Sequence, residues 1–121
     1  MIIKPDKNKA RLQRAKRSSD IHGTAQRPRL SVNRTLGEMY AQLINDDTGV
    51  TVAAVNTLQP SIVALVKGKT KKEAAFIVGQ EIGKIAKRKK VEKVVFDRNG
   101  FVYTGRVAQV ADGARDAGLK F

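Results

Sequence analysis

Polar and apolar residues alternate with a period of two over three segments in the first half of the chain. These segments are 29–33, 39–45 and 50–56, and each contains several aliphatic or β-branched residues. Such a period is typical of half-buried β-strands. The intervening segments 34–38 and 46–49 predict turns, the second with a glycine available for a positive φ. The pattern therefore predicts an antiparallel meander of three strands.

Helical spacing of apolar residues begins near residue 70. Thr70 and Glu73 have the spacing of a capping box, in which two side chains satisfy backbone amides of the first turn reciprocally. The basic run 87–90 complements the negative end of the predicted helix. Pro60 also favours a shorter helix over 61–66. The apolar stripe of the long helix consists of Ala75, Val78, Ile82, Ile85 and Ala86.

One more strand and one more helix are predicted in the last third of the chain. Residues 91–96 predict a short strand that is buried on both faces, and residues 101–103 are expected to be extended. Gly105 opens the last helix, and Gly118 is well placed to end it. A meander followed by helix, strand and helix predicts an α/β fold with a mixed sheet. In such a sheet, residues 91–96 run parallel to an earlier strand.

Composition narrows the class of protein. The 121 residues suit a single domain with one core, and 41% of them are hydrophobic. Cysteine is absent, which excludes disulfides and thiolate metal sites. No apolar run approaches the roughly 18 residues that span a bilayer, and the N-terminus has no apolar signal core. We therefore expect a protein of the cytoplasm, with an organelle matrix as the alternative.

The charge is strongly positive and unevenly distributed. Lys and Arg number 24 against 11 Asp and Glu, which gives a net charge of +13. This excess favours nucleic acid as the partner, with an anionic membrane or an acidic protein as alternatives. Residues 1–26 are basic and poor in large apolar side chains, so they predict a flexible arm that folds against phosphates, with a helix over 6–16 once its charges are neutralised. A solvated tail is the alternative. Residues 27–121 form the single domain.

A series of short motifs follows one order along the whole chain. They are Arg27-Pro28-Arg29-Leu30-Ser31-Val32, Tyr40-Ala41-Gln42, Val94-Val95-Phe96-Asp97-Arg98, Gly105-Arg106-Val107 and the ending Gly118-Leu119-Lys120-Phe121. The series resembles the bacterial L18 family of ribosomal proteins, with the weakest fit over 57–69. This resemblance implies a structural protein of the large subunit that binds 5S rRNA. It also implies that the protein helps to join 5S to 23S rRNA in the central protuberance, beside neighbouring ribosomal proteins of the 5S particle. The implied fold is related to the ribonuclease H topology.

Two positions depart from the family's pattern. Asn33 stands where an aromatic residue is usual, and Thr104 stands where a histidine is usual. An aromatic residue that stacks on a base contributes about 1–3 kcal/mol to binding. Asn33 lacks that contribution but can hydrogen-bond instead. The missing histidine weakens the case for base recognition at its loop, where Arg106 is retained.

The residues expected to contact RNA are all basic. Arginine can fork two hydrogen bonds to a phosphate or stack on a base, which suits folded RNA. Arg106 stands in the first turn of the last helix, where a cation is unfavourable unless an anion lies nearby. In the arm the expected contacts are Lys4, Lys7, Lys9, Arg11, Arg14, Lys16 and Arg17, and in the domain they are Arg27, Arg29, Arg34, Arg98 and Arg106.

Several residues of the domain have structural alternatives. Arg34 can form an ion pair with Glu38 across the turn. Arg98 follows the carboxyl end of a strand, where it can meet phosphate with Asp97 orienting it, or can simply pair with Asp97 inside the turn. Tyr103 suits sheet packing better than base stacking.

The sequence offers no active site. Asp46 and Asp47 belong to a turn and Asp97 alone stands at a strand end, so the carboxylates do not converge as a two-metal nuclease requires. His22, the only histidine, has no expected partner. We therefore expect no catalytic residue, metal, cofactor or small-molecule substrate. A module for DNA or another RNA is the binding alternative, but the basic residues of 70–90 gather at the helix ends rather than on a reading face.

Overall fold

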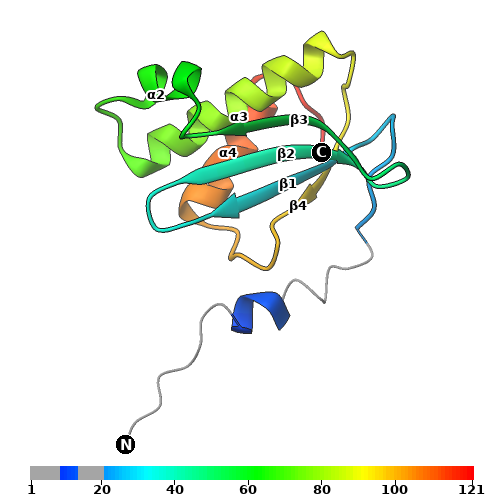
Figure 1. The fold of residues 1–121 in the computed structure, drawn as a ribbon, viewed down its shortest axis with the longest axis horizontal. Coiled ribbons are helices and arrows are strands. Elements are labelled where there is room, and N and C mark those ends of the chain that lie inside the picture. The colour runs from blue at the N-terminus through cyan, green and yellow to red at the C-terminus, as the bar shows by residue number, and fades with distance from the viewer. Residues whose placement is uncertain (1–8, 14–20) are drawn as a thin grey trace, which may run out of the picture.

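Four strands form one mixed sheet in the computed structural model, which describes residues 9–13 and 21–121. The strands are β1 (Arg29–Arg34), β2 (Met39–Asn45), β3 (Val50–Asn56) and β4 (Val95–Asp97), in the order β3-β2-β1-β4. β2 pairs antiparallel with β1 and with β3, whereas β4 pairs parallel with β1. The predicted meander and the mixed α/β fold are confirmed (Figure 1).

Three helices complete the domain: α2 (Pro60–Val66), α3 (Lys71–Arg88) and α4 (Gly105–Asp116). α3 and α4 cover one face of the sheet (Figure 1). A short helix over 9–13 lies below the β4 edge of the sheet in the view of Figure 1. It falls within the helix expected over 6–16, of which the remaining residues lie outside the described part of the chain.

Only one half of the predicted capping box forms at the start of α3. The hydroxyl oxygen of Thr70 accepts a hydrogen bond from the backbone N–H of Glu73 at 3.2 Å, as an N-cap residue should. The Glu73 carboxylate accepts from the same hydroxyl at 3.2 Å instead of reaching a backbone amide. The reciprocal half of the box is therefore replaced by a contact between two side chains.

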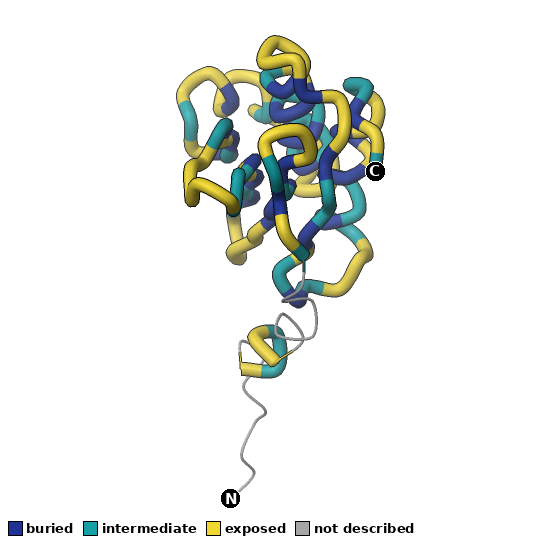
Figure 2. Tube along the Cα trace, turned by 90° about the vertical axis from the view of Figure 1, so that its right-hand side faces the viewer, coloured by how far each residue is buried: buried dark blue, intermediate teal, exposed yellow. Residues whose placement is uncertain are grey.

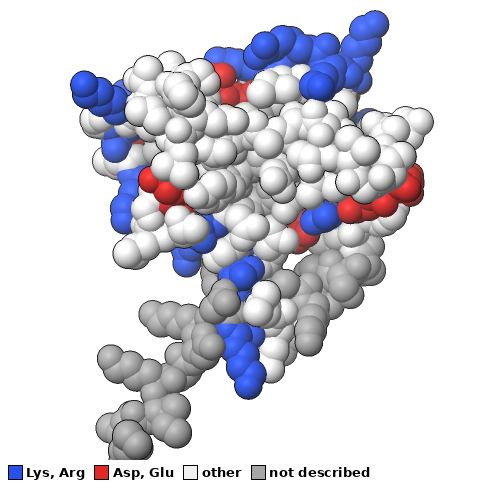
Figure 3. Space-filling view, viewed as in Figure 1, with Lys and Arg blue, Asp and Glu red and all other residues white. Residues whose placement is uncertain are grey.

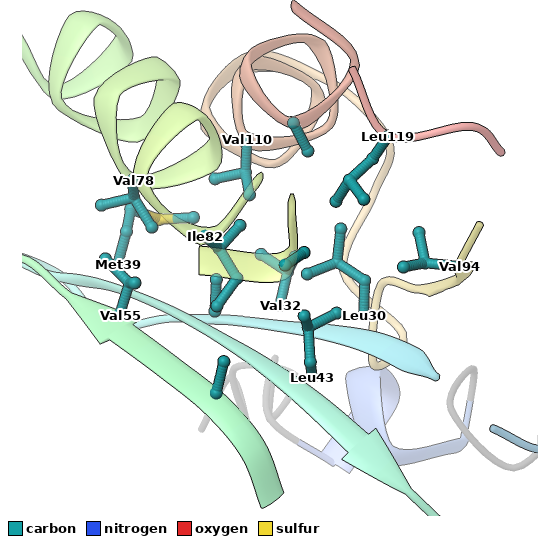
Figure 4. Close-up of a cluster of buried hydrophobic side chains, with 14 of the residues drawn as sticks. Leu30, Val32, Met39, Leu43, Val55, Val78, Ile82, Val94, Val110 and Leu119 are labelled. Carbon is teal, nitrogen blue, oxygen red and sulfur yellow. The ribbon is translucent and has the colours of Figure 1, made fainter. Parts of the chain in front are cut away.

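The core lies between the sheet and the two long helices. Alternate residues of β2 and of the second half of β3 point into it, whereas Leu30, Ser31 and Val32 of β1 are all buried; Figure 2 shows the buried stretches in dark blue. The helices contribute the predicted stripe of α3 and the inner face of α4 (Figure 4). The largest fully buried side chains are Leu30, Met39, Leu43, Ile82, Val32, Val55, Val78, Val94, Val107 and Val110.

The last strand differs from the prediction. We expected residues 91–96 to form a strand buried on both faces, but β4 covers only Val95–Asp97 and lies at the edge of the sheet. Val95 and Phe96 are half-buried. Before β4 the chain pairs with its own C-terminal segment instead, because the N–H of Val94 donates to the carbonyl of Lys120 at 3.2 Å. Residues 101–103, expected to be extended, join no strand.

Glycines bring α3 and α4 into backbone contact. A Cβ atom added at Gly79 of α3 would lie 2.1 Å from the carbonyl oxygen of Val110 in α4. A Cβ added at Gly113 of α4 would lie 2.1 Å from the carbonyl oxygen of Phe76 in α3. The contact is therefore reciprocal, and only residues without a Cβ permit it. The sequence patterns did not predict this contact.

Replacing Gly113 with alanine tests this contact. Alanine favours helix over glycine by about 1 kcal/mol, so an unconstrained site would be stabilised. Here the added methyl overlaps a backbone carbonyl, and we expect Gly113→Ala to lower the free energy of unfolding by about 2–4 kcal/mol. Gly37→Ala is the control, because a Cβ there meets nothing within 4 Å. Urea unfolding measures both, and a stabilised Gly113→Ala protein would contradict the close contact.

Candidate nucleic-acid interface

Arg29 joins two acidic residues from distant parts of the chain. Its Nε and Nη2 donate to the two carboxylate oxygens of Asp46 at 2.9 and 3.1 Å, and its Nη1 donates to Asp97 at 2.9 Å. All three side chains are largely removed from solvent. The group ties the β2–β3 turn and the end of β4 to β1. Arg29 was expected to contact RNA, but in this structure its donors hold the fold together.

The same group keeps Asp46 ionised. The hydrogen bond from Arg29, followed by one from the backbone N–H of Gly23, lowers the pKa of Asp46 from 3.8 to about 2. The bonds to Asp46, more than those to Asp97, raise the pKa of Arg29 against the opposing effect of burial. The two carboxylates are thus neutralised within the domain, and neither opposes an anionic ligand at the surface.

The loop after β4 is folded back onto β1. Asn99 has a φ of 51°, a left-handed conformation that asparagine tolerates better than most residues. Its side-chain amide donates to the hydroxyl of Ser31 at 2.7 Å and to the carbonyl of Val32 at 2.9 Å. Its backbone N–H donates to Asp97 at 2.9 Å. These bonds hold the loop against β1 and thereby fix the position of Phe101.

Two arginines lie against the ring of Phe101. The guanidinium carbons of Arg11 and Arg34 are 4.6 and 5.4 Å from the ring centroid, within the range of cation–π attraction. Arg11 also donates to the carbonyl of Asn99 at 2.9 Å. The described part of the arm is therefore seated on the loop after β4, and it brings a cation to the edge of β1.

Arg106 completes this arginine cluster, which consists of Arg11, Arg34 and Arg106. It occupies the first turn of α4 and donates to the carbonyl of Thr35 at 3.0 Å. Burial, and then the positive charge of Arg34, lower the pKa of Arg106. Both effects disfavour the charged form, which arginine nevertheless keeps. A partly buried cation beside a second cation and a helix N-terminus is a site that an anion would stabilise.

Other expected contacts lie apart from this cluster. Arg98 is exposed on the loop after β4, Arg27 is exposed just before β1, and Lys9 is exposed on the short helix. The remaining arm residues, Lys4, Lys7, Arg14, Lys16 and Arg17, lie outside the described residues. The structure thus brings together three of the twelve expected contacts and gives a fourth, Arg29, a structural partner.

Two alternative pairings and one expected lack of a partner are wrong. Arg34 does not pair with Glu38, whose carboxylate instead accepts from the hydroxyl of Thr57. Asp97 neither orients nor pairs with Arg98, because Arg29 from the neighbouring strand reaches it first. His22 has a partner after all: its Nε2 lies 2.6 Å from a carboxylate oxygen of Asp47. In each case the partner is remote in sequence: pairing of β1 with β4 brings Arg29 to Asp97, and the hydrogen bonds between Gly23 and Asp46 bring His22 to Asp47.

Phe101 and Tyr103 make contacts that the sequence patterns do not predict. Phe101 was expected only as part of an extended segment, yet it supports the arginine cluster. Tyr103 packs edge-on against Phe96, as sheet packing predicts, and its hydroxyl accepts from Arg115 at 3.1 Å. Arg115 also lies 4.3 Å from the centroid of the Phe121 ring. No spacing in the sequence signals these contacts, because they join β4, α4 and the C-terminus.

Charged side chains lie at the edge of the strand side of the molecule (Figure 3). Seen from the strand side, the middle of the molecule is uncharged, and Lys and Arg side chains gather around its edge (Figure 3). Within the described residues, no three His, Asp or Glu side chains form a group that could hold a metal ion. None of the helices in that part of the chain combines the length and apolar character needed to cross a bilayer.

Comparison with known proteins identifies the family. A model described as ribosomal L18 of archaea, bacteria, mitochondria and chloroplasts matches residues 5–121. The chain belongs to the ribosomal L18 family. It is 50% identical to the large ribosomal subunit protein uL18 of Desulforamulus reducens, 52% to that of Lactobacillus delbrueckii subsp. bulgaricus and 48% to that of Clostridioides difficile. Each match covers 100% of both chains.

Membership of the ribosomal L18 family confirms the coarser expectations. This is a family of structural ribosomal proteins, so the chain is a non-enzymatic component of the translation machinery. Its relatives are bacterial, which confirms the expected location on ribosomes of the cytoplasm.

The ion pairs of Arg29 with Asp46 and Asp97 predict how the stability of the fold depends on pH. The pKa of Asp46 is lower in the folded chain than its ordinary 3.8, so its contribution to stability is complete above about pH 4. That contribution is lost as the pH falls toward 2. At pH 7 we expect Asp46→Asn to lower the free energy of unfolding by about 1–3 kcal/mol, the usual range for hydrogen bonds to charged groups.

Urea unfolding of both proteins between pH 2 and 7 measures this dependence. The difference between wild type and Asp46→Asn should shrink below pH 4. Asp112→Asn is the control, because Asp112 is exposed and its nearest cation, Arg115, is 4.0 Å away. A difference for Asp46→Asn that stays constant down to pH 2 would show that the ion pair does not stabilise the fold.

Proposed function

We propose that this chain binds 5S rRNA and helps to attach it to 23S rRNA in the central protuberance of the large subunit, beside neighbouring proteins of the 5S particle. The observation that carries the proposal is the arginine cluster. Arg34 and Arg106 lie close together, and neither forms an ion pair with a carboxylate of the described residues. The net charge of +13 causes self-repulsion in the free chain, and a polyanionic partner would relieve it.

The chemistry of the cluster favours RNA among polyanions. Arginine planes can stack on bases as well as bind phosphates, and folded RNA presents both groups in loops and bulges. The support from Phe101 holds two of these planes in place before binding, which lowers the entropy lost on binding. The family resemblance then favours 5S rRNA among folded RNAs.

The resemblance also implies a ribonuclease H-like topology, which we include in the proposal. The strand order β3-β2-β1-β4 supports it, because the chain crosses over through α2 and α3 to place β4 parallel to β1. The topology implies no nuclease activity here. Asp46 and Asp97 are held by Arg29 and are not available as metal ligands.

The proposal divides the chain into a basic arm, residues 1–26, and a binding domain, residues 27–121. Residues 21–26 already contact the domain. The N–H of Gly23 donates to the Asp46 carboxylate at 2.8 Å, and the N–H of Asp46 donates to the carbonyl of Gly23 at 2.9 Å. A deletion that tests the arm should therefore end at residue 20.

Competition between RNAs tests the proposed function. The full-length protein bound to labelled 5S rRNA is challenged with an equal mass of unlabelled tRNA or of unlabelled 5S rRNA. We expect 5S rRNA to compete at least about tenfold better, a difference of ~1.4 kcal/mol. Recovery of 5S and 23S rRNA fragments after cross-linking in the large subunit would extend the result to attachment. Equal competition by tRNA would show that the protein binds polyanions without selectivity for 5S rRNA, and it would contradict the proposal.

Deletion of residues 1–20 tests the arm. Seven basic residues precede Ser18. Removing one phosphate contact lowers the slope of log affinity against log salt by about 0.7–0.9, and we expect about two to five contacts to disappear. Arg106→Ala should change the slope by about one contact and reduce selectivity for 5S rRNA. Melting temperatures of the deleted and full-length proteins should agree closely. An unchanged slope after deletion would identify the arm as a solvated tail.

A further inference from the structure

The open face of the sheet contains a hollow in which Arg34 of the arginine cluster is the one charged lining residue. Its floor is made of two cross-strand pairs, Ser31 opposite Gln42 and Asn33 opposite Tyr40. Arg34 and Thr35 line its remaining side, and its volume is about 290 Å³. These strand positions alternate with the core residues, so their side chains point away from α3 and α4. In Figure 3 the middle of this face is uncharged.

The hollow offers hydrogen-bonding groups that the fold itself does not use. The side-chain amides of Asn33 and Gln42 are exposed, and neither makes a hydrogen bond within the described residues. Each amide supplies both a donor and an acceptor. Ser31 is buried at 7% exposure, and its hydroxyl accepts from Asn99 at 2.7 Å, which leaves its own proton to donate. The ring of Tyr40 is half-buried beside them.

The charged residue that lines the hollow stands at its wall, and the floor carries only neutral side chains. Arg34 lies at one wall and also against Phe101, next to Arg11. Of the nearby acids, Asp46 and Asp97 are paired with Arg29, which lies on the same face of β1. A ligand held here would therefore place a neutral polar part on the floor and a negative part at the wall.

We propose that this hollow binds one unpaired base of the bound RNA, while Arg34 and its neighbours in the arginine cluster bind the adjoining phosphate. This inference rests on the proposed function and names a subsite of it. A base edge carries adjacent donors and acceptors, which two amides and a hydroxyl can match. The Tyr40 ring supplies apolar surface for the base. A base is exposed in this way only where RNA is single-stranded, looped or bulged.

Other occupants fit the hollow less well. A phosphate on the floor would face amides and a hydroxyl, whereas the cations stand at the side. An aliphatic side chain would remove the amides of Asn33 and Gln42 from water without replacing their hydrogen bonds, which is unfavourable. A flat, neutral and polar group joined to an anion uses both the polar floor and the cation at the wall.

Chemical probing of the complex tests the inference. Full-length protein bound to 5S rRNA is treated with dimethyl sulfate and with a carbodiimide, which modify exposed base edges. In the wild-type complex we expect at least one unpaired base to be protected. In Gln42→Ala and in Asn33→Ala that base should become reactive while other protections persist. Each variant should bind 5S rRNA about 5- to 100-fold more weakly, the range for removal of one base contact, with an unchanged salt slope.

Gln109→Ala is the matched control, because it removes the same amide from α4, on the opposite side of the sheet. It should leave both affinity and protection unchanged. Melting curves verify folding, and if one hollow variant is destabilised, the other decides the result. Identical protection and affinity in both folded hollow variants would overturn the subsite while leaving 5S binding intact. Failure of the wild-type protein to prefer 5S rRNA over tRNA would instead overturn the proposed function.

Discussion

The backbone contact between α3 and α4 constrains the position of Arg106, the one residue of the arginine cluster that α4 carries. Gly79 and Gly113 allow each helix to approach a carbonyl oxygen of the other, at a separation that a single methyl group would forbid. α4 is thereby held at a fixed height over the sheet, and its first turn reaches the end of β1. Arg106 can then donate to Thr35 at 3.0 Å. A looser helix pair would move this cation away from Arg34.

Opposite charges serve different purposes on the strand side of the molecule. Arg29 forms ion pairs with the carboxylates of Asp46 and Asp97, and it thereby joins the β2–β3 turn, β1 and β4. Arg34 and Arg106 instead contact an aromatic ring and a carbonyl oxygen, which orient a guanidinium without neutralising it. The acidic residues thus stabilise the fold, and the net positive charge is left for a ligand. The same separation keeps the neighbouring hollow free of negative charge.

Local order in the loop after β4 links the fold to its surface. Asn99 binds β1 through its side chain and the arm through its carbonyl oxygen. The loop therefore carries Phe101 to the place where the arm and β1 meet. Arg11 and Arg34, from two separate parts of the chain, share this one support.

The sequence by itself determined the meander, the long capped helix, the last helix and the family, because these depend on local periodicity, capping and ordered motifs. It also placed Arg34 and Arg106 among the twelve expected contacts, Arg106 because an arginine in the first turn of a helix is locally unfavourable. Only the tertiary structure decided that Arg29 stabilises the fold, that Phe101 supports two arginines and that glycines join the helices. Their partners lie far away in sequence: 68 residues separate Arg29 from Asp97. Such pairings follow from the strand order and from helix packing, which no local pattern encodes.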